Sequence, residues 1–215
     1  MTNPTISLSD MEAVEAKANS LKTEYPGTPE EKLLNQAAHD LYGARDYEEL
    51  NGWRKATIRS YLRPISGRDV CSYCGCGIIS SEGADVMHHQ SIHNRFEKAI
   101  ETLGYRPLIS REQDESRSQG WSEMNKDQPI ELRIKGALKL LRTFFDQSLE
   151  TAIRNDYWKE HPSFEKYAAY FTPNPGFFPE EIEGELLRMF GRIPGEMTPG
   201  QQHWNPPRAT RLPGR

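Results

Sequence analysis

Apolar residues recur every three or four positions in the first part of the chain, which is typical of amphipathic helices. Ser9 followed by Glu12 has the pattern of a capping box and predicts the start of a first helix. The segment Thr28-Pro29-Glu30-Glu31 combines a capping residue, an early proline and a glutamate, and it predicts a second helix that stops near Gly43. The apolar faces of these two helices are Met11, Val14, Ala18 and Leu21, and then Leu33, Leu34, Ala37, Ala38 and Leu41.

A third helix follows after a short turn. Asp46 with Glu49 predicts its start, and Pro64 ends it because a proline cannot continue a helix. The second and third helices therefore form either an αα-hairpin or a DNA-reading helix-turn-helix, of which the plain hairpin is far commoner. The apolar face of the third helix is Leu50, Trp53, Thr57 and Tyr61.

The pattern in the second half of the chain predicts one long helix and two short ones. Residues 107–128 are polar, with many serines and charges, and we expect them to form a linker. Helical spacing then begins at Pro129, and shorter helices are expected at residues 162–171 and 179–190. The tail, residues 192–215, is rich in Pro, Gly, Gln and Arg and is expected to be disordered. The apolar face of the long helix is Ile130, Ile134, Ala137, Leu138, Leu141, Phe145, Leu149 and Ala152.

The composition favours a modest core and an uneven distribution of charge. Hydrophobic residues make up 36% of the chain, which is less than in an average globular protein. The formal net charge of -4 argues against a protein that coats nucleic acid non-specifically. The stretch before the first cysteine is nevertheless basic, so a local patch for nucleic acid is possible on an acidic protein. The candidate nucleic-acid contacts are Arg54, Lys55, Arg59 and Arg63, and the simpler interpretation of these residues is a solvated helix face.

All three cysteines lie between positions 71 and 76, a spacing that does not suit a disulfide framework. Clustered thiols near histidines favour a metal ion and a reducing compartment. The N-terminus has neither a basic region nor an apolar run, so we expect no signal peptide. No stretch reaches the roughly 20 apolar residues needed to span a bilayer. We therefore expect a cytoplasmic protein without a membrane partner.

Cys71 and Cys74 have two residues between them, the spacing at which a tight turn directs both sulfur atoms at one ion. His89 and His93 are four positions apart, so on a helix they share one face. Two sulfur and two nitrogen donors make the tetrahedral set that zinc prefers. The sequence therefore predicts a Zn²⁺ site formed by these four residues.

The segment of residues 69–100 resembles the two-Cys, two-His ββα zinc finger, and the rest of the chain does not. Apolar residues occupy the positions of the finger's small core and of the helix face: Ile78, Val86, Ile92 and Phe96. The resemblance implies two strands, one helix and a metal ion that supplies folding energy. The chain departs from the family in a longer gap before the first histidine and in Asp69, where the family prefers an aromatic residue. Cys76 and His88 remain alternative ligands.

These features predict a mostly α protein, that is, a helical protein with a small ββα zinc-binding module inserted near the middle. We expect an N-terminal helical region with a basic third helix, a zinc module with an extended helix, a linker, a C-terminal helical region and a disordered tail. Their expected bounds are residues 1–66, 67–106, 107–128, 129–191 and 192–215.

The resemblance to a finger does not by itself indicate DNA reading. A finger that reads DNA projects residues near its helix start into the major groove. The corresponding residues are Glu82, Asp85 and His88, and phosphates repel the two acids. We therefore interpret the zinc as structural, bracing the basic helix at residues 47–62 against the long helix at residues 85–103.

An enzymatic alternative arises because the segment also resembles the HNH-type nucleases. In this interpretation Asp85-Val86-Met87-His88-His89 ends a strand, and one of the histidines activates water beside a divalent metal. Asn94 follows too soon to leave the loop that these nucleases have before their last helix. No second Cys-x-x-Cys pair follows either. No catalytic residue is assigned, and an enzyme is disfavoured.

The favoured function is that of a zinc-binding, non-enzymatic adaptor or nucleic-acid-associated protein, which contacts nucleic acid or a complex that handles it. The first alternative is a metal-dependent HNH-like endonuclease that uses His88 and His89. The second is a protein–protein interaction module with a structural zinc.

Overall fold

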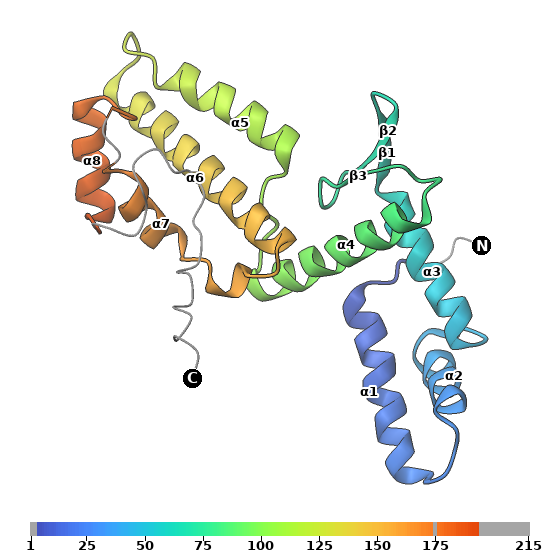
Figure 1. The fold of residues 1–215 in the computed structure, drawn as a ribbon. Coiled ribbons are helices and arrows are strands. Elements are labelled where there is room, and N and C mark those ends of the chain that lie inside the picture. The colour runs from blue at the N-terminus through green and yellow to red at the C-terminus, as the bar shows by residue number, and fades with distance from the viewer. Residues whose placement is uncertain (1–3, 174–175, 194–215) are drawn as a thin grey trace, which may run out of the picture. The chain divides into compact units, whose positions relative to one another are not determined.

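The computed structural model describes residues 4–173 and 176–193, and the chain divides into two compact units, Met1–Thr102 and Leu103–Arg215 (Figure 1). The described residues form eight α-helices and one three-stranded sheet, so the predicted mostly α class is confirmed. None of the described helices is both long enough and apolar enough to cross a membrane.

The first unit begins with three helices around a shared apolar core. They are α1 (Leu8–Glu24), α2 (Glu30–Tyr42) and α3 (Tyr47–Ser60). Their buried faces are largely those that the apolar spacing predicts, although Leu41 is exposed. The predicted capping box of α1 is wrong by two residues, because Ser7 and Asp10 form it in place of Ser9 and Glu12.

A small antiparallel sheet follows α3. Its strands are β1 (Leu62–Ile65), β2 (Arg68–Cys71) and β3 (Gly77–Ile78), in that order, and helix α4 (Gly83–Leu103) comes next. Ser66 and Gly67 join β1 to β2 with φ angles of 49° and 81°, as a two-residue hairpin loop requires. The segments β2, β3 and α4 form the predicted ββα arrangement. Strand β1 is an addition to it, and Pro64 is tolerated there because β1 is an edge strand.

The second unit contains a helix where the sequence pattern predicts a linker. Residues 107–128 include α5 (Ser110–Glu123), so the linker prediction is wrong. Helix α5 packs along α6 (Ile130–Arg154), the long helix that the apolar spacing does predict.

Small and polar residues of α5 make its contact with α6. A Cβ atom added to Gly136 would lie 2.7 Å from the carbonyl oxygen of Gly120, so the two backbones approach very closely. The hydroxyl groups of Ser116 and Thr143 share a hydrogen bond of 2.7 Å beside this crossing. An interface of this kind leaves no apolar period in the sequence, which is why the pattern of α5 resembles that of a loop.

The rest of the second unit is an aromatic core between α6 and the elements that follow it. These are η1 (Trp158–Glu160), α7 (Phe164–Phe171) and α8 (Glu180–Phe190). Helices α7 and α8 lie close to the predicted ranges 162–171 and 179–190. Phe144 stacks on Phe171 with ring centroids 5.3 Å apart. The tail expected at residues 192–215 lies almost wholly outside the described residues.

Candidate metal centre

A tight turn between β2 and β3 carries two of the predicted ligands. Cys71 is the last residue of β2, and Cys74 lies in the turn. Two backbone hydrogen bonds close the turn, from Gly75 N to Cys71 O at 2.8 Å and from Cys71 N to Cys76 O at 2.9 Å. Gly75 has a φ angle of 69°, which an L side chain rarely adopts, so a glycine is needed at this point of the turn.

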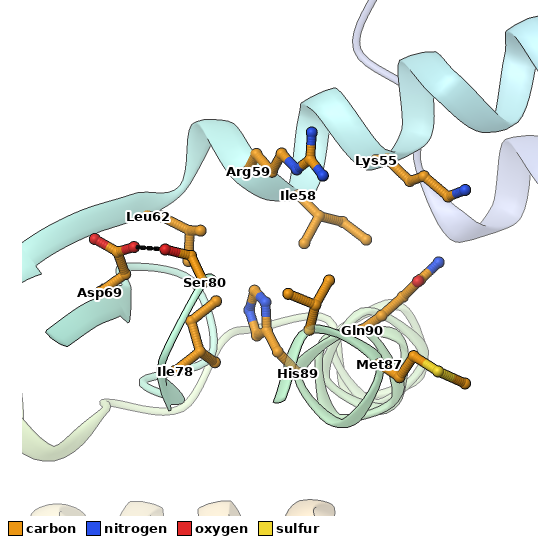
Figure 2. A pocket seen from close by; sticks show the side chains of 11 residues that line it. Lys55, Ile58, Arg59, Leu62, Asp69, Ile78, Ser80, Met87, His89 and Gln90 are labelled. Carbon is orange, nitrogen blue, oxygen red and sulfur yellow. Dashed lines mark hydrogen bonds between the residues drawn. The ribbon is translucent and has the colours of Figure 1, made fainter. Parts of the chain in front are cut away.

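Helix α4 carries the other two predicted ligands. His89 lies in its second turn (Figure 2), and His93 lies one turn further along the same buried face. The ligand atoms of Cys71, Cys74, His89 and His93 all lie within 4.8 Å of one another. All four side chains are buried. The structure therefore brings together the four residues that the spacing predicts, and the cluster they form could hold a metal ion.

The two alternative ligands are not part of this cluster. The thiol of Cys76 contacts the carbonyl oxygen of Gly77 at 3.7 Å, and His88 is exposed on α4. Across the described ranges, no other group of His, Cys, Asp or Glu side chains converges closely enough to hold a metal.

The spacing of the donor atoms fits a tetrahedral ion. Sγ of Cys71 lies 3.6 Å from Nδ1 of His93. Zinc bonds of about 2.3 Å to sulfur and about 2.1 Å to nitrogen, at the tetrahedral angle, separate the two donors by about 3.6 Å. Nε2 of His89 is buried and has no hydrogen-bond partner among the described residues. A buried nitrogen without a partner is unfavourable, and coordination of a cation through this nitrogen would remove that cost.

The two thiols differ in acidity. Contact with Cys74, and then contacts with His89 and His93, hold the pKa of Cys71 far below its usual range in spite of burial. Contact with the Cys71 thiolate, followed by burial, raises the pKa of Cys74. Without metal, one thiolate is therefore favoured over two. Because zinc binds thiolates, loading the site releases the proton of the second thiol.

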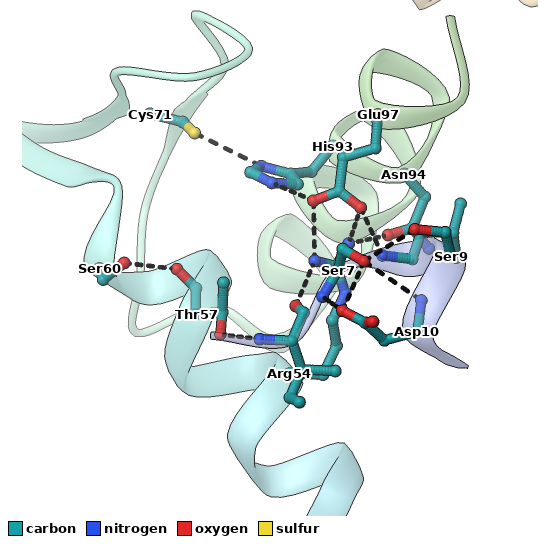
Figure 3. A network of polar contacts seen from close by, with 12 residues as sticks. Ser7, Ser9, Asp10, Arg54, Thr57, Ser60, Cys71, His93, Asn94 and Glu97 are labelled. Carbon is teal, nitrogen blue, oxygen red and sulfur yellow. Dashed lines mark hydrogen bonds and ion pairs between the residues drawn. The ribbon is translucent and has the colours of Figure 1, made fainter. Parts of the chain in front are cut away.

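The carboxylate of Glu97 contacts the candidate ligand His93 on the side of the ring that faces away from Cys71. Nε2 of His93 lies 3.2 Å from Oε1 of Glu97, so Nδ1 is the nitrogen that faces Cys71. Arg54 donates hydrogen bonds to both carboxylate oxygens, at 2.8 and 2.7 Å, and to Asn94 Oδ1 at 2.9 Å (Figure 3). Burial lowers the pKa of His93, but Cys71 and Glu97 outweigh burial and leave that pKa raised. A carboxylate in this place orients a histidine ligand and increases its basicity.

The same carboxylate ties the N-terminal segment to the site. The amide of Leu8 donates to Glu97 Oε2 at 2.8 Å, and Arg54 donates to the carbonyl of Ile6 at 3.0 Å. The amide of Ile6 in turn donates to Thr57 Oγ1 at 3.0 Å. The ion pair of Arg54 and Glu97 thus connects α3 to α4, the two helices that the zinc is expected to brace, and links both to the start of α1.

Two tyrosine rings pack against the buried imidazole of His93. The ring of Tyr73, between the two ligand cysteines in the sequence, stacks on the imidazole of His93 with centroids 4.6 Å apart. The ring of Tyr61 lies 5.2 Å from that of Tyr73 and 5.5 Å from the imidazole. These contacts limit the access of water to the ligand and fix the plane of its ring.

Of the four basic residues predicted to contact nucleic acid, one is buried and three are exposed. Arg54 is only 3% exposed and belongs to the ion pair with Glu97, so it leaves the set of candidate nucleic-acid contacts. Lys55 and Arg59 are exposed on α3. Arg63 is exposed in β1, where it donates to the carbonyl of Ser60 at 2.7 Å.

The HNH interpretation required a strand that ends in two histidines, and the structure contradicts this. Residues 85–89 belong to the first turns of α4. Asp85 accepts a hydrogen bond from the amide of Ile79 at 3.0 Å, so this acid holds the loop before the helix.

No family model, curated protein or solved structure matches the chain. The fold and the site define a mostly α protein with a buried cluster of two cysteines and two histidines that could bind a metal ion.

Glu97 and Tyr73 are not metal ligands, but their positions relative to the ligands in the sequence could have indicated that they belong to the site. Glu97 follows His93 by four positions, which places a carboxylate next to the imidazole on a helix. Tyr73 lies inside the Cys-x-x-Cys turn itself. The partner of Glu97, Arg54, is 43 positions away and gives no such signal.

Proposed function

We propose that this chain is a zinc-binding, non-enzymatic adaptor protein, in which the zinc maintains the fold of the first unit and a surface of that unit contacts a partner. The observation that carries the proposal is the closed set of donors: Cys71, Cys74, His89 and His93 are all buried, with their ligand atoms within 4.8 Å. Four protein ligands satisfy a tetrahedral zinc ion, whereas a catalytic zinc keeps one position for water or substrate.

The small core around the cluster supports a structural role. The sheet has three short strands, and the large apolar residues buried in β3 and α4 are few: Ile78, Ile92 and Phe96. Units with so little apolar burial commonly depend on metal for their stability. Zinc also requires reduced thiols, which suits a cytoplasmic location.

The exposed basic residues beside the module support a negatively charged partner. Lys55, Arg59 and Arg63 are exposed on α3 and β1. From this charge we propose contact with nucleic acid or with a protein complex that handles it. A gel shift at rising salt tests the direct contact, because binding through phosphates weakens steeply with salt.

Metal analysis of the purified full-length protein tests the structural zinc. We expect one zinc per chain in the wild type and little in Cys71→Ser or His93→Ala. Chelation should lower the unfolding temperature of the wild type to that of the variants. A wild-type protein without zinc, or one that unfolds identically after chelation, would contradict the proposal.

A cleavage assay tests the proposal that the protein is not a nuclease. Plasmid DNA or RNA is incubated with the protein and Mg²⁺ or Mn²⁺, and we expect no cleavage above a blank. Cleavage that disappears in His88→Ala, an exposed residue outside the cluster, would assign a nuclease instead.

A further inference from the structure

The first unit contains a cavity of about 540 Å³ that the metal centre does not use. It lies between α3, the sheet and the start of α4, as Figure 2 shows. One wall is His89, so the cavity borders the metal cluster directly. A volume of this size is in the range of cavities that bind small molecules or the side chains of a partner.

The floor of this cavity is apolar and one side of it is adaptable. Its apolar lining comes from α3, β1, β3 and α4: Ile58, Leu62, Ile78, Val86 and Met87. Met87 is 74% exposed, which is unusual for a large apolar side chain. Methionine is flexible and polarisable, so it can adapt its shape to an inserted side chain.

The charged groups of the lining have one dominant sign. Lys55 and Arg59, both exposed, stand one turn apart on α3 and line the cavity. The one carboxylate of the lining belongs to Asp69, which accepts a hydrogen bond of 2.6 Å from Ser80. An apolar cavity with two cations at one side complements a ligand that is apolar at its centre and acidic beside it.

We propose that the cavity between α3 and α4 binds an acidic, amphipathic segment of a partner protein, with a large apolar side chain in the cavity and carboxylates paired with Lys55 and Arg59. This inference rests on the proposed adaptor function and names its partner class. Burial of the anchoring side chain supplies most of the affinity, as is usual at protein interfaces. The cations contribute mainly to the rate of association and to specificity.

The lining disfavours the other occupants. Proteins that bind single-stranded nucleic acid stack its bases on aromatic side chains, and among the described residues the only ring in this lining is the imidazole of the buried His89. The chain's own tail beyond residue 193 carries three arginines and one acid, so it has the same sign of charge as the cavity.

The experiment uses zinc-loaded full-length protein and a library of random dodecapeptides displayed on phage. We expect the enriched peptides to combine at least one large apolar residue with several Asp or Glu residues. A synthetic, fluorescently labelled copy of the consensus peptide is then titrated with protein and followed by anisotropy. Absence of enrichment, or a consensus without carboxylates, overturns the proposal.

Variants locate the bound peptide. Met87→Asp changes an exposed side chain of the cavity, and Lys55→Glu/Arg59→Glu reverses its charge, so each should weaken binding by about tenfold or more. Lys22→Glu/Lys32→Glu makes the same change of charge on exposed parts of α1 and α2 and should leave binding unchanged. Equal weakening in this control would show non-specific attraction and overturn the proposal.

Two further results would assign the surface to another occupant. A short labelled oligonucleotide that binds the wild type, loses binding in Lys55→Glu/Arg59→Glu and is unaffected by Met87→Asp would make nucleic acid the partner. If light scattering shows that the wild type is a dimer and that Met87→Asp is a monomer, the occupant of the cavity is a second copy of the chain. Either result overturns the peptide proposal while leaving the structural zinc in place, whereas a protein without zinc contradicts the proposed function itself.

Discussion

The first unit collects buried polar groups around a candidate metal centre, whereas the second unit fills its interior with aromatic rings and a close crossing of two helices. In the first, the buried His93 and Arg54 are joined by the half-buried Glu97 in a chain that ends at the cysteine turn. In the second, the centroids of neighbouring rings such as Phe144 and Phe171 lie 5.3 Å apart. The two units should therefore respond differently to the loss of metal and to the loss of packing.

Removal of zinc should have the largest effect and should affect the first unit alone. Loss of the ion leaves four buried donors without a common partner, and we expect the first unit to lose more than about 4 kcal/mol of stability. Amide hydrogen exchange before and after chelation measures this, unit by unit. Protection in β2, β3 and α4 should fall while protection in α6 persists. Equal loss in both units would refute the assignment of the metal to the first.

Gly136→Ala should destabilise the second unit, as loss of zinc should destabilise the first. Its new Cβ would lie 2.7 Å from backbone atoms of both Gly120 and Met124, which cannot move as a flexible side chain can. We expect a loss of about 3 kcal/mol in the free energy of unfolding. Gly184→Ala is the control, because it is also helical but nothing lies within 4 Å of its added Cβ.

In that pair, thermal unfolding should separate a destabilised Gly136→Ala protein from a control that is unchanged or slightly stabilised by the better helix propensity of alanine. Zinc content should be the same in both. Retention of wild-type stability by Gly136→Ala would show that the two helices are not in close contact.

Asp146 should give the second unit a pH dependence that the variant Asp146→Asn lacks. Burial, only partly offset by the amide of Leu108 and by Arg142, raises the pKa of this carboxyl to about 6 from an ordinary value of 3.8. Between these values the folded state binds more protons than the unfolded state. The contribution of Asp146 to stability is therefore greatest below about pH 4 and falls by roughly 3 kcal/mol as the pH rises through 6.

Denaturant unfolding of wild type and Asp146→Asn from pH 4 to pH 7 measures this difference. The asparagine variant should gain stability relative to the wild type as the pH rises. Parallel curves over the whole range would mean that the carboxyl is ionised in the folded protein at every pH tested.

Glu97→Gln should have a smaller effect, confined to the metal centre. The amide keeps the size of the side chain but removes the negative charge behind His93, and we expect zinc affinity to fall about 10- to 100-fold. Competition with a fluorescent chelator measures the affinity. Glu101→Gln, an exposed change one turn further along α4, is the control and should bind zinc as the wild type does. Equal affinity in all three proteins would show that Glu97 does not support the ligand.

The smallest effect is expected from the two residues that the cluster leaves out. Cys76→Ser and His88→Ala should each retain one zinc per chain with unchanged affinity, because neither residue is among the four converging donors. Loss of zinc in either variant would show that the substituted residue, Cys76 or His88, is a ligand in place of one of the four assigned residues.

The features that depend on local spacing could be predicted from the sequence alone. The two-residue gap between Cys71 and Cys74 and the four-residue gap between His89 and His93 are enough to predict the quartet, because turns and helices have fixed geometry. Apolar periodicity likewise predicted α1 to α3 and α6. It failed at α5, where glycine and hydroxyl contacts replace apolar ones.

Which of several similar residues act together depends on tertiary contacts and could not be predicted from the sequence. Arg54 and Lys55 are adjacent in the sequence, yet one is buried against Glu97 and the other lines the surface cavity. The exclusion of Cys76 and His88 was decided in the same way. Side chains that are similar in local sequence can differ in burial and ion pairing, because both depend on segments tens of residues away. Local spacing gives no information about those segments.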